Sequence, residues 1–158
     1  SQLAPLSEEL GVAEDYVSIQ KARFGDRLSY ESHVEEAAIL RPIPCMTVQP
    51  LIENAIQHGF PMPKAGDRIE VMAWVEEDQL MVSVKDNGAG MSPERLAEVL
   101  SGAPQEAGAS RGIGLENVLH RMRLMYGEGH VTVSSHPGLG TTITLCVPEA
   151  NNMNPASY

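Results

Sequence analysis

The sequence predicts an α+β fold, a two-layer sandwich in which one mixed β-sheet carries helices on one face. Two observations predict it. Alternating strand patterns come in pairs separated by short turns, which is typical of hairpins, and helical patterns lie between these pairs. The chain has 158 residues, of which 42% are hydrophobic and 20% charged, and this fits one globular domain with a single core.

The first expected element is a helix over residues 7–24. Ser7 is a suitable N-cap, acidic residues follow it in the first turn, and Gly25 ends the pattern. Residues 27–36 then alternate between apolar and polar side chains, which predicts a strand. The apolar face of the helix is expected to comprise Leu10, Tyr16, Val17, Ile19 and Phe24.

The middle of the chain predicts a helix followed by a hairpin. Pro42 and Pro44 indicate a short link, and a helix is expected from about residue 48 to residue 58. Residues 68–75 and 79–85 are two strand patterns with an acidic turn between them.

The last third predicts two helices and a second hairpin. Ser92 as N-cap, with proline next, begins a short helix. Residues 101–111 are rich in Gly, Ala and Ser and are expected to be mobile, and a helix follows over 113–126. Strands are expected over 130–135 and 141–147, and the tail over 151–158 shows no pattern and is expected to be disordered.

Composition excludes several classes of function. The formal net charge of −10 gives no electrostatic footprint for nucleic acid, and a polyanionic ligand would need a local device such as backbone amides or a metal. The two cysteines and five histidines show no zinc-ligand spacing. No apolar run is long enough to span a bilayer and no signal peptide opens the chain, so any membrane anchor is expected outside this sequence.

The first motif with chemical content is Gln49-Pro-Leu-Ile-Glu-Asn-Ala-Ile-Gln-His-Gly59. On a helix, Glu53, Asn54 and Gln57 cluster on one side. A carboxylate beside an amide oxygen supplies hard ligands suited to Mg²⁺, whereas the alternative is a solvated polar face. This motif alone favours neither reading.

The second motif, Asp86-Asn-Gly-Ala-Gly-Met91, directly follows a strand pattern. Gly88 and Gly90 allow the backbone to approach a ligand closely, and Asp86 is an acceptor suited to an exocyclic amine. The same composition is also common in tight turns, so the motif alone is a weak signal.

The third motif, Arg111-Gly-Ile-Gly-Leu-Glu-Asn117, places two glycines at the start of a helix. Free amides at the positive end of a helix dipole bind phosphate. No βαβ unit surrounds the motif and no Gly-Lys-Ser or Gly-Lys-Thr occurs, which excludes a dinucleotide fingerprint and a Walker loop.

Together and in this order, the three motifs resemble the nucleotide-binding domain shared by histidine kinases, DNA gyrase, Hsp90 and MutL, which has the Bergerat ATP-binding fold. Gly140-Thr141-Thr142 is similar to a fourth element of that family near adenine. The first motif, together with Tyr16-Val-Ser-Ile-Gln-Lys-Ala-Arg-Phe-Gly-Asp-Arg-Leu28 and Gly112–Val118, is similar to the LytS type of sensor histidine kinase. The resemblance covers about residues 7–148.

The resemblance implies a role for each matching residue. Asn54 would coordinate Mg²⁺, Glu53 would be a general base or part of the metal shell, and Asp86 would accept from the adenine amine. Gly112 and Gly114 would cap the phosphates, and His58 and Arg111 would approach phosphate oxygens. The implied nucleotide-binding residues are Asn54, Gln57, His58, Asp86, Gly88, Gly90, Met91, Arg111, Gly112, Ile113, Gly114, Leu115 and Thr141.

The sequence departs from the family pattern in three places. Pro50 stands where many members have an acidic or amide residue one turn before the asparagine, which leaves the identity of the base open. The phenylalanine box of many kinases is missing between Met91 and Arg111. No histidine has the context of a phosphoacceptor, since His33 lies in a strand pattern and His120 within a helix.

The expected function is therefore that of an ATP–Mg²⁺-binding catalytic domain that transfers the γ-phosphoryl group to a histidine outside this chain. Residues 1–26 would end a dimerisation and phosphoacceptor region, and 27–150 would form the catalytic domain. The resemblance implies a homodimer, a response regulator as partner and a cytoplasmic position in an inner-membrane sensor. The alternatives are a non-catalytic nucleotide-binding regulatory module and an anti-sigma-type serine kinase.

Overall fold

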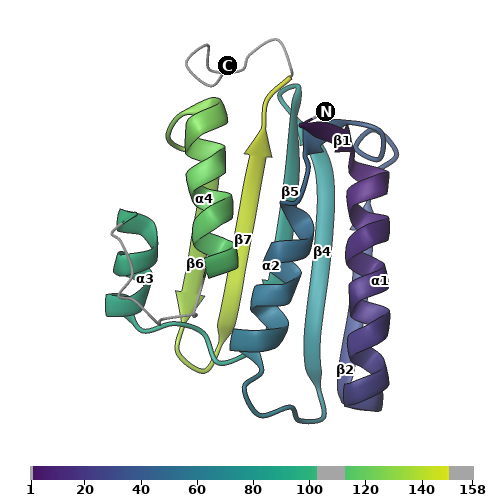
Figure 1. Cartoon of the computed structure of the whole chain (residues 1–158), viewed down its shortest axis with the longest axis vertical. Helices are drawn as coiled ribbons and strands as arrows, with labels where there is room; N and C mark the ends of the chain where they lie inside the picture. The colour runs from purple at the N-terminus through teal and green to yellow at the C-terminus, as the bar shows by residue number, and fades with distance from the viewer. Residues whose placement is uncertain (1, 103–112, 150–158) are drawn as a thin grey trace.

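The computed structural model describes residues 2–102 and 113–149 and has two layers, a β-sheet and helices that cover one of its faces (Figure 1). The expected α+β sandwich with a mixed sheet is confirmed. The helical segments are α1 (Leu6–Phe24), a 3₁₀ turn (Gly25–Arg27), α2 (Val48–Asn54), a π-helical turn (Ala55–Gly59), α3 (Pro93–Ser101) and α4 (Ile113–Tyr126). The strands are β1 (Leu3–Pro5), β2 (Leu28–Val34), β3 (Pro42–Pro44), β4 (Asp67–Glu76), β5 (Gln79–Asp86), β6 (Val131–His136) and β7 (Gly140–Val147).

The main sheet is built from two hairpins and one added strand. Its strand order is β2-β4-β5-β7-β6; β2 is parallel to β4, and the other neighbours are antiparallel. Both expected hairpins, β4–β5 and β6–β7, are present. In the first, Glu77 and Asp78 have φ values of 50° and 63°, which matches the twist of a tight hairpin turn. The β5–β7 ladder joins the two hairpins into one sheet.

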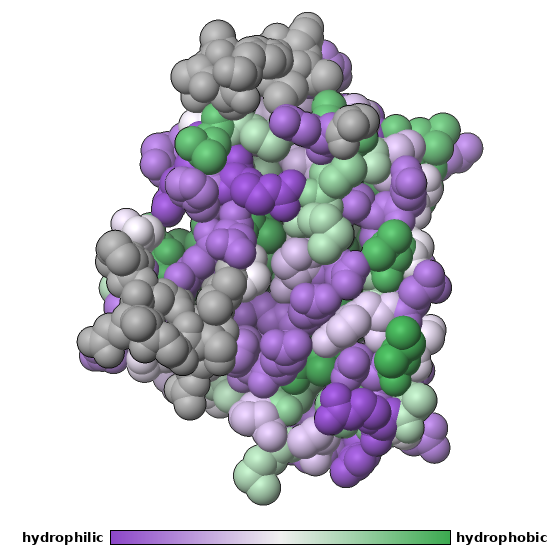
Figure 2. Space-filling view, viewed as in Figure 1, coloured by the Kyte–Doolittle hydropathy of each residue, from purple (hydrophilic) through white to green (hydrophobic). Residues whose placement is uncertain are grey.

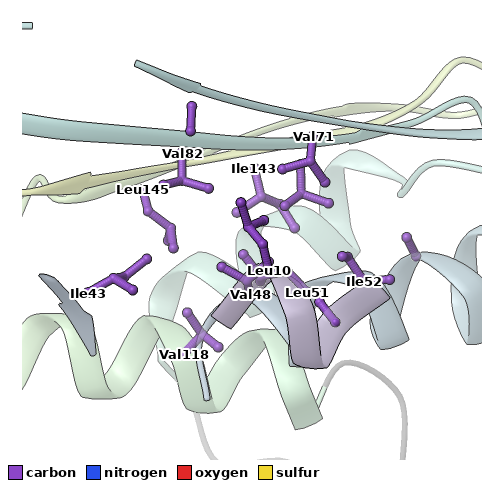
Figure 3. Packing of buried hydrophobic residues seen from close by; sticks show 14 of the residues in the cluster. Leu10, Ile43, Val48, Leu51, Ile52, Val71, Val82, Val118, Ile143 and Leu145 are labelled. Atoms are coloured by element: carbon purple, nitrogen blue, oxygen red, sulfur yellow. The ribbon is translucent and has the colours of Figure 1, made fainter. Parts of the chain in front are cut away.

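The core lies between the helices and the sheet. Alternate residues of β4, among them Ile69, Val71 and Ala73, are buried, as expected for a sheet with one covered face. They meet buried residues of α2, including Leu51 and Ile52. Figure 3 shows labelled side chains from the strands and from the helices converging in this layer.

Helix α1 buries one stripe of its surface in this core. It begins at Leu6, so the expected N-cap at Ser7 is wrong: the N-cap is Pro5, two residues earlier, where the backbone is still extended. Ile19 is 64% exposed, so its expected place in the apolar face is also wrong. The side of α1 that faces the core is the one that carries its buried apolar residues, which are Leu6, Leu10, Ala13 and Val17.

A two-stranded ribbon of β1 and β3 was not expected from the sequence. Leu3 pairs with Pro44 and Pro5 with Pro42 in an antiparallel register. The segment Pro42–Pro44, expected to be only a link, is thus a strand. Proline lacks an N–H group, so it is tolerated in a short edge ribbon of this kind but gives no strand signal in the sequence.

The start of α2 is held by contacts from two other helices. Glu9 of α1 is 7% exposed, and its carboxylate accepts a hydrogen bond of 3.1 Å from the backbone N–H of Thr47. The guanidinium of Arg121 in α4 donates to the carbonyl oxygens of Cys45 and Met46. Met46 has a φ of 59°, so these contacts hold the chain in a conformation unusual for a methionine.

The helical face of the molecule is mostly hydrophilic. Figure 2 shows hydrophobic residues scattered singly there, some along the side where α1 lies. Among the described residues, no helix combines the length and the apolarity needed to cross a membrane.

Candidate functional site

A cavity of about 470 Å³ opens where the C-terminal end of α2, the loop after β5 and the helix α3 meet. This volume lies within the range of small-molecule sites. Residues from all three sequence motifs contribute to it. The described residues that line it are Asn54, Gln57, His58, Gly59, Pro61, Asp86, Ala89, Gly90, Met91, Ser92, Arg95, Val99, Leu115 and Thr141.

The end of α2 brings three of the predicted residues to the cavity. Asn54 is the last α-helical residue, and Gln57 and His58 lie in the π-helical turn that follows. A π turn accommodates an extra residue and is frequent at functional sites. The helix expected over 48–58 is therefore present, but its last turn has a wider geometry than the sequence indicated.

Glu53 lies away from the cavity. Its carboxylate accepts a hydrogen bond of 2.8 Å from the Gln49 amide. Glu53 is not among the described residues that line the cavity, so the structure brings Asn54 to the site without its neighbour. The role of Glu53 as base or metal-shell residue stays a prediction.

Asp86, the last residue of β5, is a buried carboxylate at the cavity wall. It is 5% exposed, and its Oδ1 accepts a hydrogen bond of 2.9 Å from the Gly88 backbone N–H. Burial raises the pKa of Asp86 to about 6, while the backbone N–H groups of Gly88 and Thr141 act in the opposite direction. A buried carboxylate with few hydrogen-bond donors around it is suited to accept a hydrogen bond from a ligand.

A chain of hydrogen bonds fixes the loop after β5 against β6 and β7. The backbone N–H of Met91 donates to Oγ of Ser135 at 2.8 Å, and this hydroxyl lies 2.8 Å from Oγ1 of Thr141. Thr141 is the register partner of Asp86 in the β5–β7 ladder. Ser135 was not expected in the site; it gives no motif signal, and its place depends on the pairing of β6 with β7.

Gly88 and Gly90 are required by contacts within the protein. A Cβ atom on Gly88 would lie 2.2 Å from the carbonyl oxygen of Gly59, and one on Gly90 would lie 2.0 Å from that of His136. Gly90 lines the cavity, whereas Gly88 packs behind it against the end of the π turn. The sequence predicted that both glycines allow the backbone to approach a ligand; at Gly88 the close approach observed is to Gly59 of the protein itself.

Helix α3 supplies a wall that the sequence did not indicate. Ser92 caps the helix, as expected, by accepting a 3.1 Å hydrogen bond from the Arg95 backbone N–H, and both residues line the cavity. The Arg95 guanidinium forms an ion pair of 3.0 Å with Glu116 of α4. Among the described lining residues Arg95 is the one Arg or Lys, so it is the fixed positive charge of this wall.

The third motif is described only in part. Arg111 and Gly112 lie outside the described residues, as does most of the segment expected to be mobile, and Ile113 is placed only as the first residue of α4. Gly114 lies against the start of α2, where an added Cβ would be 3.3 Å from the Pro50 carbonyl oxygen. Leu115, 1% exposed, lines the cavity.

Comparison with known proteins places these features in a family. Residues 43–151 match the family described as "Histidine kinase-, DNA gyrase B-, and HSP90-like ATPase". The chain is 36% identical over 146 residues to the sensor histidine kinase YpdA of Escherichia coli, covering 90% of this chain and 24% of that protein. It is 31% identical over 148 residues to the sensor protein LytS of Bacillus anthracis, covering 93% and 25% respectively.

A solved structure shows the same fold. The histidine kinase domain of a blue-light activated histidine kinase from Erythrobacter litoralis EL346 superposes with a TM-score of 0.61 at 18% sequence identity, covering 94% of this chain and 63% of that one. The chain thus spans about a quarter of the length of the two sensor proteins it matches.

Proposed function

Since the chain belongs to the histidine kinase-, DNA gyrase B- and HSP90-like ATPase family, we propose that it is the ATP-binding catalytic domain of a sensor histidine kinase. The observation that carries the proposal is that one cavity is lined both by a buried carboxylate, that of Asp86, and by the side-chain amide of Asn54. The first is an acceptor for an adenine amine and the second a neutral oxygen ligand for a metal.

In the proposed reaction the chain binds and orients ATP for attack by a histidine outside it. Asp86 accepts the hydrogen bond from the exocyclic amine of adenine, and the apolar side chains of Met91, Val99 and Leu115 contribute surface to the cavity. Arg95 and His58 are placed to approach phosphate oxygens. Catalysis of this kind rests on positioning and on neutralising charge rather than on covalent chemistry by the protein.

The lining residues fit a Mg²⁺ ion that arrives with the nucleotide. Mg²⁺ takes few protein ligands and completes its shell with phosphate oxygens and water, and Asn54 offers one such ligand in the cavity. When bound, the ion would neutralise phosphate charge. The described residues contain one cluster of three potential metal-ligating His, Cys, Asp or Glu side chains, Glu31, His33 and Glu70, and none of them lines the cavity.

The proposal includes a larger protein around this domain. Residues 1–26 would end a dimerisation and phosphoacceptor region, and residues 27–150 would form the catalytic domain. The full-length protein would be a homodimer whose catalytic domain lies in the cytoplasm below an inner-membrane sensor, and it would pass the phosphoryl group to a response regulator. This chain covers 25% of the sensor protein LytS and 24% of the sensor histidine kinase YpdA, so both relatives have room for regions beyond this domain.

We expect Asn54→Ala to weaken ADP binding about tenfold or more when Mg²⁺ is present, because a ligand of the metal is lost. With EDTA in place of Mg²⁺, the variant and the wild type are expected to bind ADP alike. Isothermal titration under both conditions measures the difference, and Asn117→Ala, which changes an exposed asparagine of α4, is the matched control. An equal loss of affinity with and without Mg²⁺ would contradict the assignment of Asn54 to the metal.

We expect no self-phosphorylation of this chain, because the acceptor histidine and the proximity it requires are supplied elsewhere. Incubation with γ-labelled ATP tests this, with the chain alone and with a separately produced upstream segment of the full-length protein. Acid-labile label on the upstream segment supports the proposal. Acid-stable label would favour the serine kinase, nucleotide binding without any transfer would favour a regulatory module, and label on this chain alone would direct attention to His33 and His120.

A further inference from the structure

The carboxylate next to Arg95, that of Glu116, has no role in the proposed function. Glu116 lies in the first turn of α4 and directly follows Leu115, which is buried and lines the cavity. Its Oε1 lies 3.0 Å from Nη2 of Arg95, which comes from α3 and lines the cavity, whereas Glu116 itself is not among the described lining residues. The ion pair is therefore the contact through which Glu116 reaches the cavity.

Both helices that carry this ion pair are held in place by other contacts. Helix α3 lies beside α4 (Figure 1), and at its end the Arg123 guanidinium of α4 donates a hydrogen bond of 2.6 Å to the carbonyl oxygen of Leu100. The start of α4 packs closely on α2, since a Cβ on Gly114 would lie 3.3 Å from the Pro50 carbonyl oxygen. With the two backbones held, the conformational freedom that remains to Arg95 is mainly that of its own side chain.

Burial distinguishes Glu116 from a second acid that contacts Arg95. The side chains of Arg95 and Glu116 are only 26% and 21% exposed, whereas that of Glu98, whose Oε2 lies 3.2 Å from Nη1 of Arg95, is 66% exposed. Opposite charges attract each other more strongly where water is partly excluded, and exposed ion pairs contribute little. Of these two acids, Glu116 is therefore the one that fixes the direction of the guanidinium.

We propose that Glu116 is a positioning residue of the nucleotide site, whose carboxylate holds the Arg95 guanidinium in the orientation that receives the phosphates. The inference rests on the proposed nucleotide-binding function. An arginine side chain has many rotamers, and fixing one of them before the ligand arrives removes an entropic cost of binding. A guanidinium carries five N–H donors in one plane, so it can keep its contact with a carboxylate while it donates to a phosphate oxygen.

The first test is the affinity of the chain for ADP with Mg²⁺, measured by titration calorimetry. Glu116→Ala removes the acceptor, and we expect it to weaken binding about threefold to tenfold, the range for ordering one long side chain. Glu116→Gln keeps an acceptor oxygen without the charge and is expected to recover most of the affinity. The matched control is Glu98→Ala, which removes the exposed acid that contacts the same guanidinium and is expected to change the affinity less than about twofold.

The sign of the effect separates positioning from charge. Loss of a negative charge near the phosphates would by itself strengthen ADP binding, so tighter binding by Glu116→Ala would overturn the inference. An unchanged affinity, or an equal loss in Glu98→Ala, would overturn it as well. If circular dichroism shows that Glu116→Ala is not folded, Glu116→Asp, which withdraws the acceptor by one methylene group, is expected to show the same loss.

The second test separates positioning from a purely structural role. In an Arg95→Ala background, which itself is expected to bind ADP more weakly, Glu116→Ala is expected to have no further effect. Adenosine carries no phosphate, so its affinity, followed by NMR titration, is expected to be alike in wild type and Glu116→Ala. A loss that persists without Arg95, or an equal loss for adenosine and ADP, would overturn the inference. If the wild type itself bound no ADP, the proposed function would fail first.

Discussion

Asp86→Asn is expected to weaken ADP binding about 100-fold, the largest loss for any single change in the cavity. The carboxylate accepts from the adenine amine, and an asparagine in its place can turn a donor toward that amine. Titration calorimetry with ADP measures the effect. The matched control is Asp67→Asn, because Asp67 is also buried and also accepts from a backbone N–H, that of Lys64, but does not line the described cavity. Similar affinities of wild type and Asp86→Asn would refute the assignment of adenine to this residue.

The pH dependence of binding provides a second measure of the same residue. Burial raises the pKa of Asp86 to about 6, so its carboxylate takes up a proton as the pH falls through that value. The ratio of wild-type to Asp86→Asn affinity is therefore expected to be constant at neutral pH and to shrink below pH 6. Because the phosphates of ADP titrate identically in both proteins, the ratio isolates the side chain. A ratio that does not change between pH 5 and pH 7 would contradict an unprotonated Asp86 as the acceptor.

The same raised pKa fixes the sign of a stability effect. Between the ordinary pKa of an aspartate and a pKa of about 6, the folded chain binds more protons at Asp86 than the unfolded chain does. The free energy of unfolding contributed by this group therefore falls as the pH rises through that window. The carboxylate thus lowers stability at neutral pH, in keeping with a residue kept for binding.

Gly140→Ala is expected to lower the free energy of unfolding by more than about 4 kcal/mol, or to prevent folding. The first residue of β7 has a φ of 97°, and an added Cβ would lie 2.0 Å from the carbonyl oxygen of Asp86. That oxygen belongs to the backbone of the neighbouring strand and cannot move aside without breaking the ladder. Urea denaturation followed by circular dichroism measures the loss.

Gly138→Ala is the matched control in the same hairpin turn. Gly138 also has a positive φ, 78°, but no atom lies within 4 Å of the position of an added Cβ. It is expected to cost only the conformational strain of a left-handed residue, about 1 kcal/mol. If both alanines cost the same, the close approach of Gly140 to β5 is not what constrains this turn.

Much of the fold could be predicted because its elements are long and periodic. The two hairpins and the helix over 113–126 have regular patterns, and the structure confirms them. The β1–β3 ribbon could not be predicted, since strands of three residues with prolines have no period. The parallel pairing of β2 with β4 is non-local, and it depends on α2 crossing between them. Local pattern also misplaced Ile19, because the direction of a helix face is fixed by its packing partners.

The part of the candidate site around Asp86 was predictable because a local sequence motif indicates it. Asp86 follows a strand and precedes glycines, and the structure places it in the cavity wall. Spacing on a helix, however, put Glu53 and Asn54 together, whereas in the structure Glu53 is hydrogen-bonded to Gln49 and is not among the described residues that line the cavity. Arg95 and Ser135 were missed because their place depends on how α3 and β6 dock, and the sequence shows no spacing that reports it.

The register pair of Asp86 and Thr141 also bears on how the molecule assembles. The hairpins β4–β5 and β6–β7 close short loops, which is fast, whereas the β5–β7 ladder joins segments far apart in the chain and closes late. The cavity wall contains one residue from each strand of this ladder, Asp86 and Thr141. A shift of the strand register by one residue would turn one of these two side chains to the opposite face of the sheet. A ligand that needs both residues can recognise only the finished register. Such a ligand would slow unfolding and leave the rate of folding unchanged.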